Sequence, residues 1–403
     1  MSKHILVVSQ YYYPENFRIN DITKEWIKRG YKVTVITGIP NYPSGRFFKG
    51  YGFFRKRREI VEGVNIIRIA IIPRFQNPIL LAINYLSFVL SGWIWAKFTR
   101  LEADIVFNFE VSPMTQALPA IWFAKRKKIP CYLYVTDLWP QSVVFATGLK
   151  NKYIINRIQR MVDKIYQRCT NILISSRGFY EPIGSRGINK QKIIYWPQFP
   201  EDVYKPHQPH GKKILLPNDE LFNLTFTGNI GYAQGLSVLV ETAKILKDSN
   251  IHIRINIIGN GRYMSDFLTL INKYNVNDYF NFIGQKPSYE IPIYLSESDA
   301  AFISLEKEKV FEFTLPSKIQ TYLACGIPII GSASGELKKL IEESNCGYCS
   351  EANNPVELAS NINQMLNLSK DDLNRLASNG YRYCKENFDK EVLLKQFDEI
   401  IKC

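Results

Sequence analysis

The residues whose types and spacing best suit a chemical task lie between positions 314 and 332. Pro316 fits the first turn of a helix, Ser317 can cap that helix, and Gly326 can take the left-handed conformation that ends it. Such a helix would present the backbone amides of its first turn beside the ammonium group of Lys318. Open amides, the positive end of a helix dipole and a lysine together suit a diphosphate. The alternative interpretation is an ordinary helix-to-strand connection with a solvated lysine.

Two carboxylates stand where strands are predicted to end in the first half of the chain. Asp137 follows the apolar run 131–136, and Glu110 follows the run 103–109. A carboxylate at a strand end can orient or deprotonate a substrate hydroxyl group. We expect Asp137 to take part in catalysis or substrate binding, with Glu110 the weaker candidate. The alternative for Asp137 is a helix cap or an anchor for its own loop.

The elements that would position these residues form a repeating pattern. Apolar runs at 4–9 and 31–37 flank an amphipathic helix at 18–29, and a second strand–turn–helix unit begins at 221–228. This pattern predicts doubly wound parallel sheets, in which ligands bind at the carboxyl ends of the strands. The opening lacks the G-x-G-x-x-G fingerprint, which argues against a nicotinamide enzyme.

The length of the chain predicts two domains, because 403 residues exceed the usual size of one hydrophobic core. A proline-rich stretch without apolar periodicity begins at position 196 and is typical of a hinge. The predicted parts are an N-terminal domain at 1–196, a hinge at 197–217, a C-terminal domain at 218–385 and a terminal helix at 386–403.

The composition favours anionic partners. The formal net charge is +14, which suits nucleic acid, acidic lipid head groups or phosphorylated substrates. The seven cysteines show no zinc-ligand spacing, so we interpret them as reduced cytosolic thiols. The first strand follows the start of the chain directly, which predicts no signal peptide and a cytoplasmic site. No D-x-D stands at a strand end, and we predict no obligatory metal and no cofactor.

Two segments suggest contact with a membrane. Residues 45–58 interleave aromatic and basic side chains, a pattern that can dock on an anionic membrane, bind nucleic acid or form a solvated loop. The absence of any nucleic-acid-binding signature favours the membrane. Residues 75–96 contain no charge and are close to the roughly 20 residues that span a bilayer. A helix lying in the interface, a buried core helix and a spanning helix are the alternatives, and we favour the first.

Two motifs carry a resemblance to a known family. The stretch P-S-K-x-x-x-Y-L-A-C-G-x-P-I-I at 316–330 resembles the nucleotide-sugar segment of the retaining glycosyltransferase family 4. The loops Y-Y-Y-P-E-N-F-R-I-N-D at 11–21 and T-G-I-P-N-Y-P at 37–43 are similar to its subgroup of L-fucosamine transferases of O-antigen, lipopolysaccharide and capsule assembly. The resemblance implies the GT-B architecture, with two Rossmann-like α/β domains, an interdomain cleft and a C-terminal helix that crosses back to the N-terminal domain. The first domain would bind the acceptor and the second the nucleotide-sugar.

The chain departs from the family at positions that normally carry charge. The family's glutamate five residues before the glycine, which contacts ribose, is Thr321 here, and Glu312 is a nearby candidate for the first glutamate of that pattern. The family's arginine and lysine that neutralise the diphosphate correspond by position to Asn229 and Gln234. The resemblance therefore implies that the positive charge comes from other side chains, for which the candidates are Lys318, Arg262 and Arg18.

The residue chemistry and the resemblance together give a predicted site. Its catalytic residues are Asp137, Lys318 and Glu15. Its substrate-binding residues lie on the loops that follow predicted strands and at the start of the helix after Pro316: Asn16, Arg18, Glu110, Gly228, Asn229, Gly231, Gln234, Gly259, Arg262, Gln285, Lys286, Glu312, Pro316, Ser317 and Thr321.

The predicted function is a glycosyl transfer with retention of anomeric configuration. The resemblance implies a UDP-sugar donor carrying N-acetyl-L-fucosamine and an acetamido sugar on a polyprenyl diphosphate as the acceptor. The enzyme would associate peripherally with the cytoplasmic face of the inner membrane through residues 45–58 and 75–96, without nucleic acid as a partner. The alternatives are a UDP-sugar 2-epimerase of the same fold, which would act without an acceptor, and a non-catalytic basic protein that binds membrane or nucleic acid.

Overall fold

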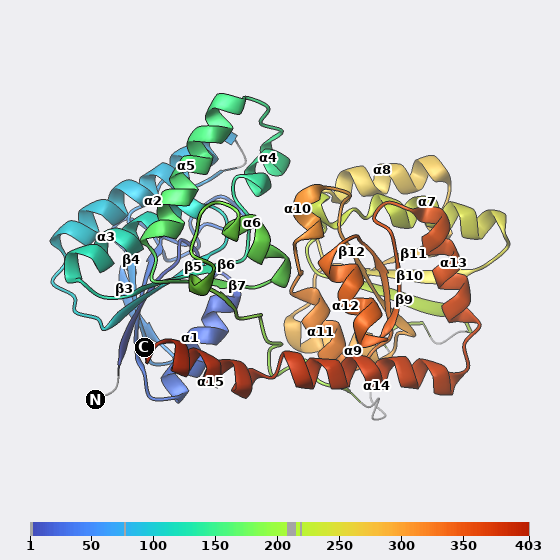
Figure 1. The fold of residues 1–403 in the computed structure, drawn as a ribbon. Helices are drawn as coiled ribbons and strands as arrows, with labels where there is room; N and C mark the ends of the chain where they lie inside the picture. The colour runs from blue at the N-terminus through green and yellow to red at the C-terminus, as the bar shows by residue number, and fades with distance from the viewer. Residues whose placement is uncertain (1–2, 76–77, 208–214, 218–219, 403) are drawn as a thin grey trace. The chain divides into compact units, whose positions relative to one another are not determined.

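The chain folds into two α/β units (Figure 1). The computed structural model describes residues 3–75, 78–207, 215–217 and 220–402. The N-terminal unit contains Met1–Ser175 and Phe179–Trp196, and the C-terminal unit contains Ser176–Gly178 and Pro197–Cys403. The predicted pair of Rossmann-like units is confirmed, whereas the cleft between them stays a prediction. Part of the predicted hinge, 208–214, lies outside the described residues.

The N-terminal unit is built on an eight-stranded sheet in the order β3-β4-β2-β1-β5-β6-β7-β8. All neighbouring strands are parallel except the antiparallel pair β3–β4. The strands are β1 His4–Val8, β2 Lys32–Gly38, β3 Arg58–Val61, β4 Val64–Ile69, β5 Ile105–Glu110, β6 Cys131–Val135, β7 Asn171–Ile174 and β8 Ile193–Tyr195. The parallel strands β1, β2, β4, β5 and β6 therefore bring their carboxyl ends to one edge.

The helices of this unit cover the sheet through large aromatic side chains. They are α1 Arg18–Lys28, α2 Pro78–Phe98, α3 Ala117–Lys127, α4 Gln141–Thr147, α5 Lys152–Arg168 and α6 Tyr180–Gly184, with short 3-10 turns at Met114–Gln116, Arg177–Phe179 and Lys190–Lys192. Trp26 of α1 packs edge-on against Phe107 of β5, with ring centroids 5.0 Å apart. Trp196 packs against Tyr134 of β6 at 5.1 Å, so buried aromatic rings tie helix, sheet and the end of the unit together.

Helix α2 has one side attached to the unit and one side exposed. Asn84 accepts a hydrogen bond from Gln10 at 2.7 Å and donates to the Ile72 carbonyl. Gly92 lies so close to α3 that a Cβ atom there would be 2.3 Å from Pro119 Cγ. On the other side, Leu86, Leu90 and Phe98 are 64, 61 and 69% exposed. Helix α2 is therefore held along one face and presents an apolar stripe on the other.

The C-terminal unit contains a six-stranded, fully parallel sheet in the order β11-β10-β9-β12-β13-β14. The strands are β9 Phe222–Thr227, β10 Ile253–Ile258, β11 Phe280–Phe282, β12 Ala300–Ser304, β13 Ile329–Ser332 and β14 Gly347–Ser350. The helices are α7 Ser237–Asp248, α8 Met264–Tyr274, α9 Ile291–Ser296, α10 Lys309–Glu312, α11 Lys318–Cys325, α12 Glu336–Ser344, α13 Pro355–Leu366, α14 Lys370–Asn387 and α15 Lys390–Ile400, with 3-10 turns at Tyr232–Gln234, Asn277–Tyr279 and Ser288–Glu290.

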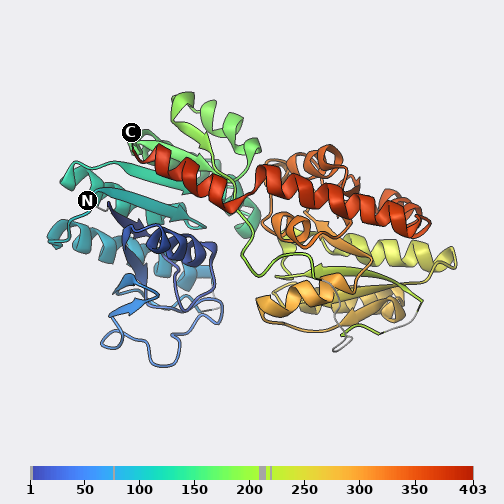
Figure 2. The same cartoon turned by 90° about the horizontal axis from the view of Figure 1, so that it is seen from below.

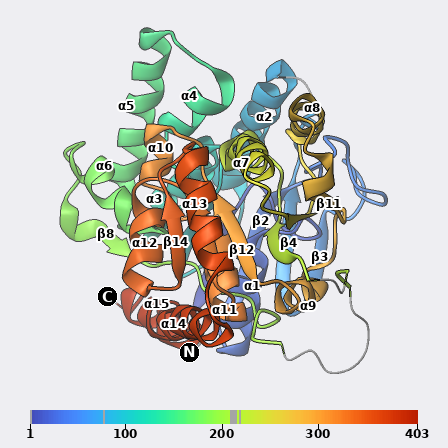
Figure 3. The ribbon, with the colours of Figure 1, turned by 90° about the vertical axis from the view of Figure 1, so that its right-hand side faces the viewer.

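The C-terminal sheet has a separate hydrophobic core on each face. One core joins the strands to α7, α8 and α13, and α7 packs directly against α13 (Figure 3). The other core joins them to α9, α11 and α12 and includes Cys384 of α14. Burial on both faces explains why these strands are almost continuously apolar.

The terminal helix predicted at 386–403 corresponds to α15, which has narrower bounds, Lys390–Ile400. Helix α14 continues to Asn387, and a separate helix, α15, begins at Lys390 (Figure 2). The break occurs because the side chain of Asp389 accepts a hydrogen bond from the Val392 amide at 3.0 Å and so caps a new helix. That α15 contacts the N-terminal unit stays a prediction.

Candidate functional site

The P-S-K segment forms the short helix that its sequence predicts, with a different start. Helix α11 begins at Lys318 and ends at Gly326, which has the left-handed φ of 63° expected of it. The predicted cap by Ser317 is wrong, because this residue already has helical dihedrals and its side chain makes no capping hydrogen bond. The Ile319 amide bonds to the Pro316 carbonyl at 3.1 Å. The first amides of a helix in general lack a partner within the helix and are available to a ligand.

Lys318 reaches from α11 back over the end of strand β9. Its Nζ donates to Gln234 Oε1 at 2.7 Å and lies 4.0 Å from the ring centroid of Phe226. Among the described residues, no carboxylate forms an ion pair with it. Desolvation lowers the pKa of Lys318 to about 7. About half of the Lys318 side chains therefore carry a proton at pH 7, and an incoming anion would favour this charged form.

Two glycines allow this approach. Gly228 has a φ of +117°, and a Cβ atom there would lie 2.7 Å from Cε of Lys318. Gly259, at the end of β10, has a φ of +149°, and a Cβ atom there would lie 1.8 Å from the carbonyl oxygen of Gly228. The two turns after β9 and β10 consequently pack backbone to backbone, and neither position accepts a side chain without displacement.

The turn after β9 also offers backbone donors. The Gly228 amide is already bonded to the Ile258 carbonyl at 2.8 Å, and the Ile230 amide is bonded to Asn260 at 3.0 Å. The amides of Asn229 and Gly231 have no acceptor among the described residues. Alternate amides of the turn thus remain available to a ligand, beside the lysine that contacts Gln234.

A small hollow lies after the carboxyl end of β12, close to the P-S-K segment in sequence. Its lining includes the predicted Glu312 and two residues that the sequence analysis missed, Glu306 and Ser334; the full lining is Leu305, Glu306, Lys307, Glu308, Phe311, Glu312, Ser334 and Ala352. Glu306 Oε1 accepts hydrogen bonds from the Lys307 amide at 3.0 Å and from Asn353 Nδ2. Glu306 follows β12 almost directly, so the rule that selected Asp137 applies to it as well.

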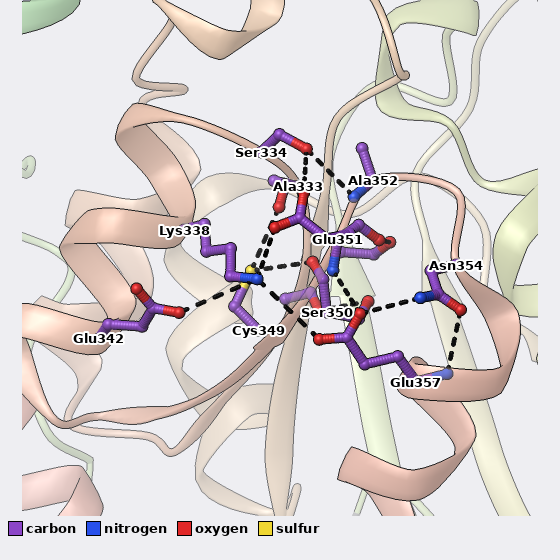
Figure 4. Close-up of polar contacts among 12 residues, drawn as sticks. Ala333, Ser334, Lys338, Glu342, Cys349, Ser350, Glu351, Ala352, Asn354 and Glu357 are labelled. Carbon is purple, nitrogen blue, oxygen red and sulfur yellow. Dashed lines mark hydrogen bonds and ion pairs between the residues drawn. The ribbon is translucent and has the colours of Figure 1, made fainter.

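A charged network holds one wall of this hollow (Figure 4). The Nζ atom of Lys338, on α12, lies 2.7 Å from a carboxylate oxygen of Glu351. It lies 3.9 Å from Glu357 and 4.0 Å from Glu342. Glu351 in turn accepts a hydrogen bond from the Ser334 hydroxyl at 2.6 Å. The hydrogen bonds from Lys338 and Ser334 lower the pKa of Glu351. Ser334 is therefore fixed by neighbours that are themselves ionised.

The remaining predicted residues of this unit differ in accessibility. Thr321 is buried in α11, and its hydroxyl donates to the Ser317 carbonyl at 3.5 Å. Glu312 forms an ion pair with Lys309 at 2.6 Å, and Lys286 lies 5.9 Å from the ring of Tyr294. Arg262 and Gln285 are exposed on the turns after β10 and β11. Their predicted contacts with a substrate stay predictions.

In the N-terminal unit, the structure brings Glu110 and Asp137 together. The Asp137 amide donates to Glu110 Oε2 at 3.4 Å, and Asp137 Oδ2 accepts from the Ser112 amide and hydroxyl, both at 2.9 Å. Burial, followed by the charge of Asp137, raises the pKa of Glu110 well above its ordinary value. Burial thus favours the protonated form of Glu110, while its partly exposed neighbour Asp137 anchors the β5 loop.

Glu15 lies away from this pair and is almost completely buried. Its Oε1 accepts from the amides of Asn41 and Tyr42 at 2.7 and 2.6 Å, and its Oε2 accepts from Tyr12 at 3.3 Å. Burial raises the pKa of Glu15 to about 7 despite these hydrogen bonds. The carboxyl group therefore joins the loops after β1 and β2, and its predicted catalytic role stays a prediction.

Arg18 and Asn16, on the same loop, have different surroundings. Asn16 is exposed, whereas the Arg18 side chain is largely buried and lies 4.0 Å from Asp21. The charge of Arg18 also acts to lower the pKa of the buried Tyr134, which burial raises. Arg18 is thus close to the core of the N-terminal unit, and its predicted contact with a phosphate is not tested by these contacts.

Comparison with known proteins identifies the C-terminal part of the chain. Residues 208–383 match the family model described as "Glycosyl transferases group 1". WcaI of Escherichia coli K12, named as a glycosyl transferase of colanic acid biosynthesis, is 25% identical over 415 residues that cover 98% of each chain. WbjE of Pseudomonas aeruginosa, named as a glycosyltransferase, is 23% identical over 67% of each chain.

Solved structures agree on the fold over the whole chain. The sucrose-phosphate synthase of Thermosynechococcus elongatus covers 99% of this chain with a TM-score of 0.79 at 15% identity, and 98% of that protein is covered. Anabaena HepE, solved with UDP and glucose, gives a TM-score of 0.70 at 14% identity over 99% of both chains. The match of residues 208–383 to this family model and the full-length similarities identify the chain as a glycosyltransferase with the GT-B fold.

Proposed function

We propose that this enzyme transfers N-acetyl-L-fucosamine from a UDP-sugar to an acetamido sugar on a polyprenyl diphosphate, with retention of anomeric configuration, during synthesis of a bacterial surface polysaccharide. The relatives named for colanic acid biosynthesis support the process, and HepE, solved with UDP, supports the donor class. The choice of sugar rests on the resemblance of the loops at 11–21 and 37–43 to L-fucosamine transferases.

The observation that carries the proposal is the position of Lys318. Its ammonium group lies at the start of α11, beside the Asn229 and Gly231 amides of the turn after β9. A diphosphate bound there would contact the ammonium group, these amides and the start of the helix. When the bond between the anomeric carbon and the diphosphate breaks, negative charge develops on the departing oxygen. A charge held in a desolvated setting stabilises that oxygen more strongly than the same charge does in water.

The acceptor side of the proposal rests on the N-terminal unit. Asp137 is partly exposed at the carboxyl end of β6 and is fixed by Ser112, so it can orient an acceptor hydroxyl. In this scheme the departing phosphate takes the acceptor proton, because Asp137 already accepts two hydrogen bonds from Ser112 and Glu110 is buried. Asp137 therefore acts by orientation.

The membrane part of the proposal is supported by α2 and by the basic segment before it. Among the described residues, α2 is the one helix that is long and apolar enough to cross a bilayer, and only 22% of its apolar window is buried. A plain core helix would be mostly buried, so this value disfavours that alternative. Phe53 and Phe54, in the segment 45–58, are exposed beside Arg55 and Lys56. Aromatic and basic side chains of this kind suit the surface of an anionic membrane.

The test is an incubation of the purified chain with a panel of UDP-sugars and a synthetic prenyl-diphosphate-linked acetamido sugar, followed by mass measurement of the products. Transfer from UDP-N-acetyl-L-fucosamine, with retention seen by NMR, is the expected outcome. The control omits the acceptor, so that any change in the UDP-sugar alone would reveal an epimerase. Transfer of a different sugar would overturn the donor assignment while leaving the glycosyltransferase activity in place.

A further inference from the structure

Arg74 is a buried positive charge that the proposed function does not use. It lies between β4 and α2, and its side chain belongs to a residue that is only 7% exposed. Among the described residues, no carboxylate forms an ion pair with it, and its Nε has no hydrogen-bond partner. Burying an unpaired charge costs free energy, so such a group needs either a structural partner or a ligand.

The contacts that Arg74 does make hold its position without neutralising it. Its amide donates to Asn41 Oδ1 at 3.1 Å, its Nη1 lies 3.5 Å from the Tyr11 hydroxyl, and its guanidinium carbon lies 5.0 Å from the ring centroid of Tyr42. Glu15 is the carboxyl group whose pKa Arg74 acts to lower, but both of its oxygens accept backbone amides. The guanidinium group itself therefore contacts the Tyr11 hydroxyl and the Tyr42 ring, and the bond to Asn41 fixes only the backbone of Arg74.

Arg68, the other arginine buried in the same region, shows what a structural arginine looks like in this unit. Its Nη2 lies 2.5 Å from Glu59 and donates to the Tyr13 carbonyl at 2.8 Å, and its Nη1 donates to Lys56 at 3.0 Å. Its Nε is also without a partner, but its charge is balanced by a carboxylate. The difference between the two arginines is thus that Arg68 forms an ion pair, whereas no carboxylate among the described residues lies within ion-pair distance of Arg74.

The surroundings of Arg74 indicate which anion would fit. The aromatic rings of Tyr11, Phe17 and Tyr42 pack against one another, with centroids 5.2 to 5.6 Å apart, on loops after the carboxyl ends of β1 and β2. The next residue, Phe75, donates to the Gly45 carbonyl at 3.0 Å. Arg74 therefore lies near Gly45, the first residue of the basic segment 45–58, and shortly before the apolar helix α2 begins. A ligand bound there would have its anionic group at Arg74 and an apolar tail along α2.

We infer that Arg74 binds a phosphate group of the lipid-linked acceptor. The inference rests on the proposed function for the identity of the acceptor. A guanidinium group offers two parallel N–H donors to phosphate oxygens, and an ionic hydrogen bond in a desolvated place is stronger than a neutral one. The same contact would fix the distance between the lipid and the sugar that receives the transferred group.

The test measures binding by isothermal titration calorimetry in a chain that carries Lys318→Ala, so that the anion site of the C-terminal unit does not contribute. The probes are farnesyl diphosphate, farnesol and inorganic diphosphate. Farnesyl diphosphate should bind more tightly than the other two, and Arg74→Gln should weaken its binding by about tenfold or more, the effect of losing a hydrogen bond to a charged group. Arg46→Gln, which removes an exposed charge from the neighbouring segment, should change it by less than about twofold.

Several outcomes would overturn the inference. If farnesyl diphosphate bound equally well with and without Arg74→Gln, Arg74 would be excluded as the binding residue. If farnesol bound as tightly as farnesyl diphosphate, a contact with the phosphate would be excluded. Inorganic diphosphate binding as tightly as farnesyl diphosphate would indicate a site for free phosphate. Arg74→Lys keeps the charge, loses the paired donors and should bind with intermediate affinity; circular dichroism checks that both variants are folded. If the sugar panel gave no transfer while Arg74-dependent binding persisted, only the proposed function would fail.

Discussion

The two units of this enzyme differ sharply in charge. Residues 1–196 contain 30 lysines and arginines against 11 acidic residues, whereas residues 197–403 contain 21 against 26. The formal charge of +14 therefore belongs to the N-terminal part, and the C-terminal part is slightly acidic. The unit that matches the group 1 glycosyl transferase model thus offers one enclosed lysine, Lys318, as its proposed phosphate-binding group, whereas the N-terminal part has a large excess of basic residues.

This difference indicates two ways of attracting an anion. A field from many exposed charges acts over a distance, raises the rate of encounter and is weakened by salt. A single desolvated ammonium group acts only at contact, but it is strong there and is little affected by salt. We infer that the N-terminal unit is adapted to an extended anionic surface and the C-terminal unit to one small anion.

The substitution Lys318→Ala should have the largest effect. Loss of the charge that stabilises the departing diphosphate should lower kcat by about a thousandfold or more, with the fold unchanged by circular dichroism. The rate of sugar transfer measures this effect. The matched control is Lys339→Ala, which removes an exposed lysine of α12 in the same unit and should leave the rate within about twofold. If Lys318→Ala were nearly as active as the unaltered enzyme, the inference that the C-terminal unit binds one small anion through Lys318 would be wrong.

When UDP binds above neutral pH, Lys318 should take up a proton from the solvent. The pKa of Lys318 is about 7 in the free protein, and a bound diphosphate raises it by favouring the charged form. The dissociation constant should therefore increase by up to about tenfold for each pH unit above 7, until the raised pKa is reached. Calorimetry at pH 8 in buffers of different ionisation enthalpy counts the protons. Binding enthalpies that do not depend on the buffer would contradict this reading of Lys318.

Membrane binding should depend on α2 and not on exposed apolar residues elsewhere. Leu90→Glu should reduce sedimentation of the enzyme with anionic vesicles by about tenfold, because one apolar contact is lost and one repulsive charge is gained. UDP binding and thermal stability should be unchanged, since Leu90 is 61% exposed. The control is Val356→Glu on α13, where the side chain is 67% exposed in the C-terminal unit. If both variants lost vesicle binding to the same extent, membrane binding would not depend specifically on α2.

Glu110→Gln should have the smallest effect, and one that depends on pH. Because burial raises the pKa of Glu110, the folded state holds a proton that the unfolded chain releases as the pH rises above about 4.5. The unaltered protein should therefore lose stability as the pH rises above about 4.5. The Glu110→Gln variant should not lose stability in this way, because glutamine does not ionise. The difference in the free energy of unfolding between the variant and the unaltered protein should therefore shift by about 1 kcal/mol in favour of the variant from pH 5 to pH 8, as measured by urea unfolding. A constant difference at all pH values would indicate that Glu110 is ionised when folded.

Local patterns allowed the sequence to predict much of the C-terminal site. The P-S-K segment, Gly326 and the glycines after β9 and β10 lie within a few residues of the strands and helices that use them. The hairpin of β3 and β4 was missed, although Glu62 and Gly63, both with positive φ, stand between two β-branched runs. The missed signal was the two-residue turn at Glu62 and Gly63, which follows the basic segment 45–58 that was interpreted as a membrane contact.

Other features depend on contacts between distant parts of the chain. Arg74 looks like a flanking charge in the sequence, and only its packing against Tyr11 and Tyr42, 63 and 32 positions earlier, shows that it is buried. The protonated state of Glu110 depends similarly on burial and on Asp137 in another strand-end loop. Burial of a polar group is decided by tertiary structure, so a motif search does not reveal it.

The attachment of α2 along one side limits how this helix can meet lipid. Crossing a bilayer would require it to leave α3 at Gly92 and to break the bonds that Asn84 makes with Gln10 and Ile72, which would leave these amides without partners in hydrocarbon. Lying flat requires no such loss, because the exposed stripe is already turned outward. An enzyme anchored in this way would be washed from its membrane by alkali or high salt without detergent, and could move between the surface and the cytosol as its acceptor is made and consumed.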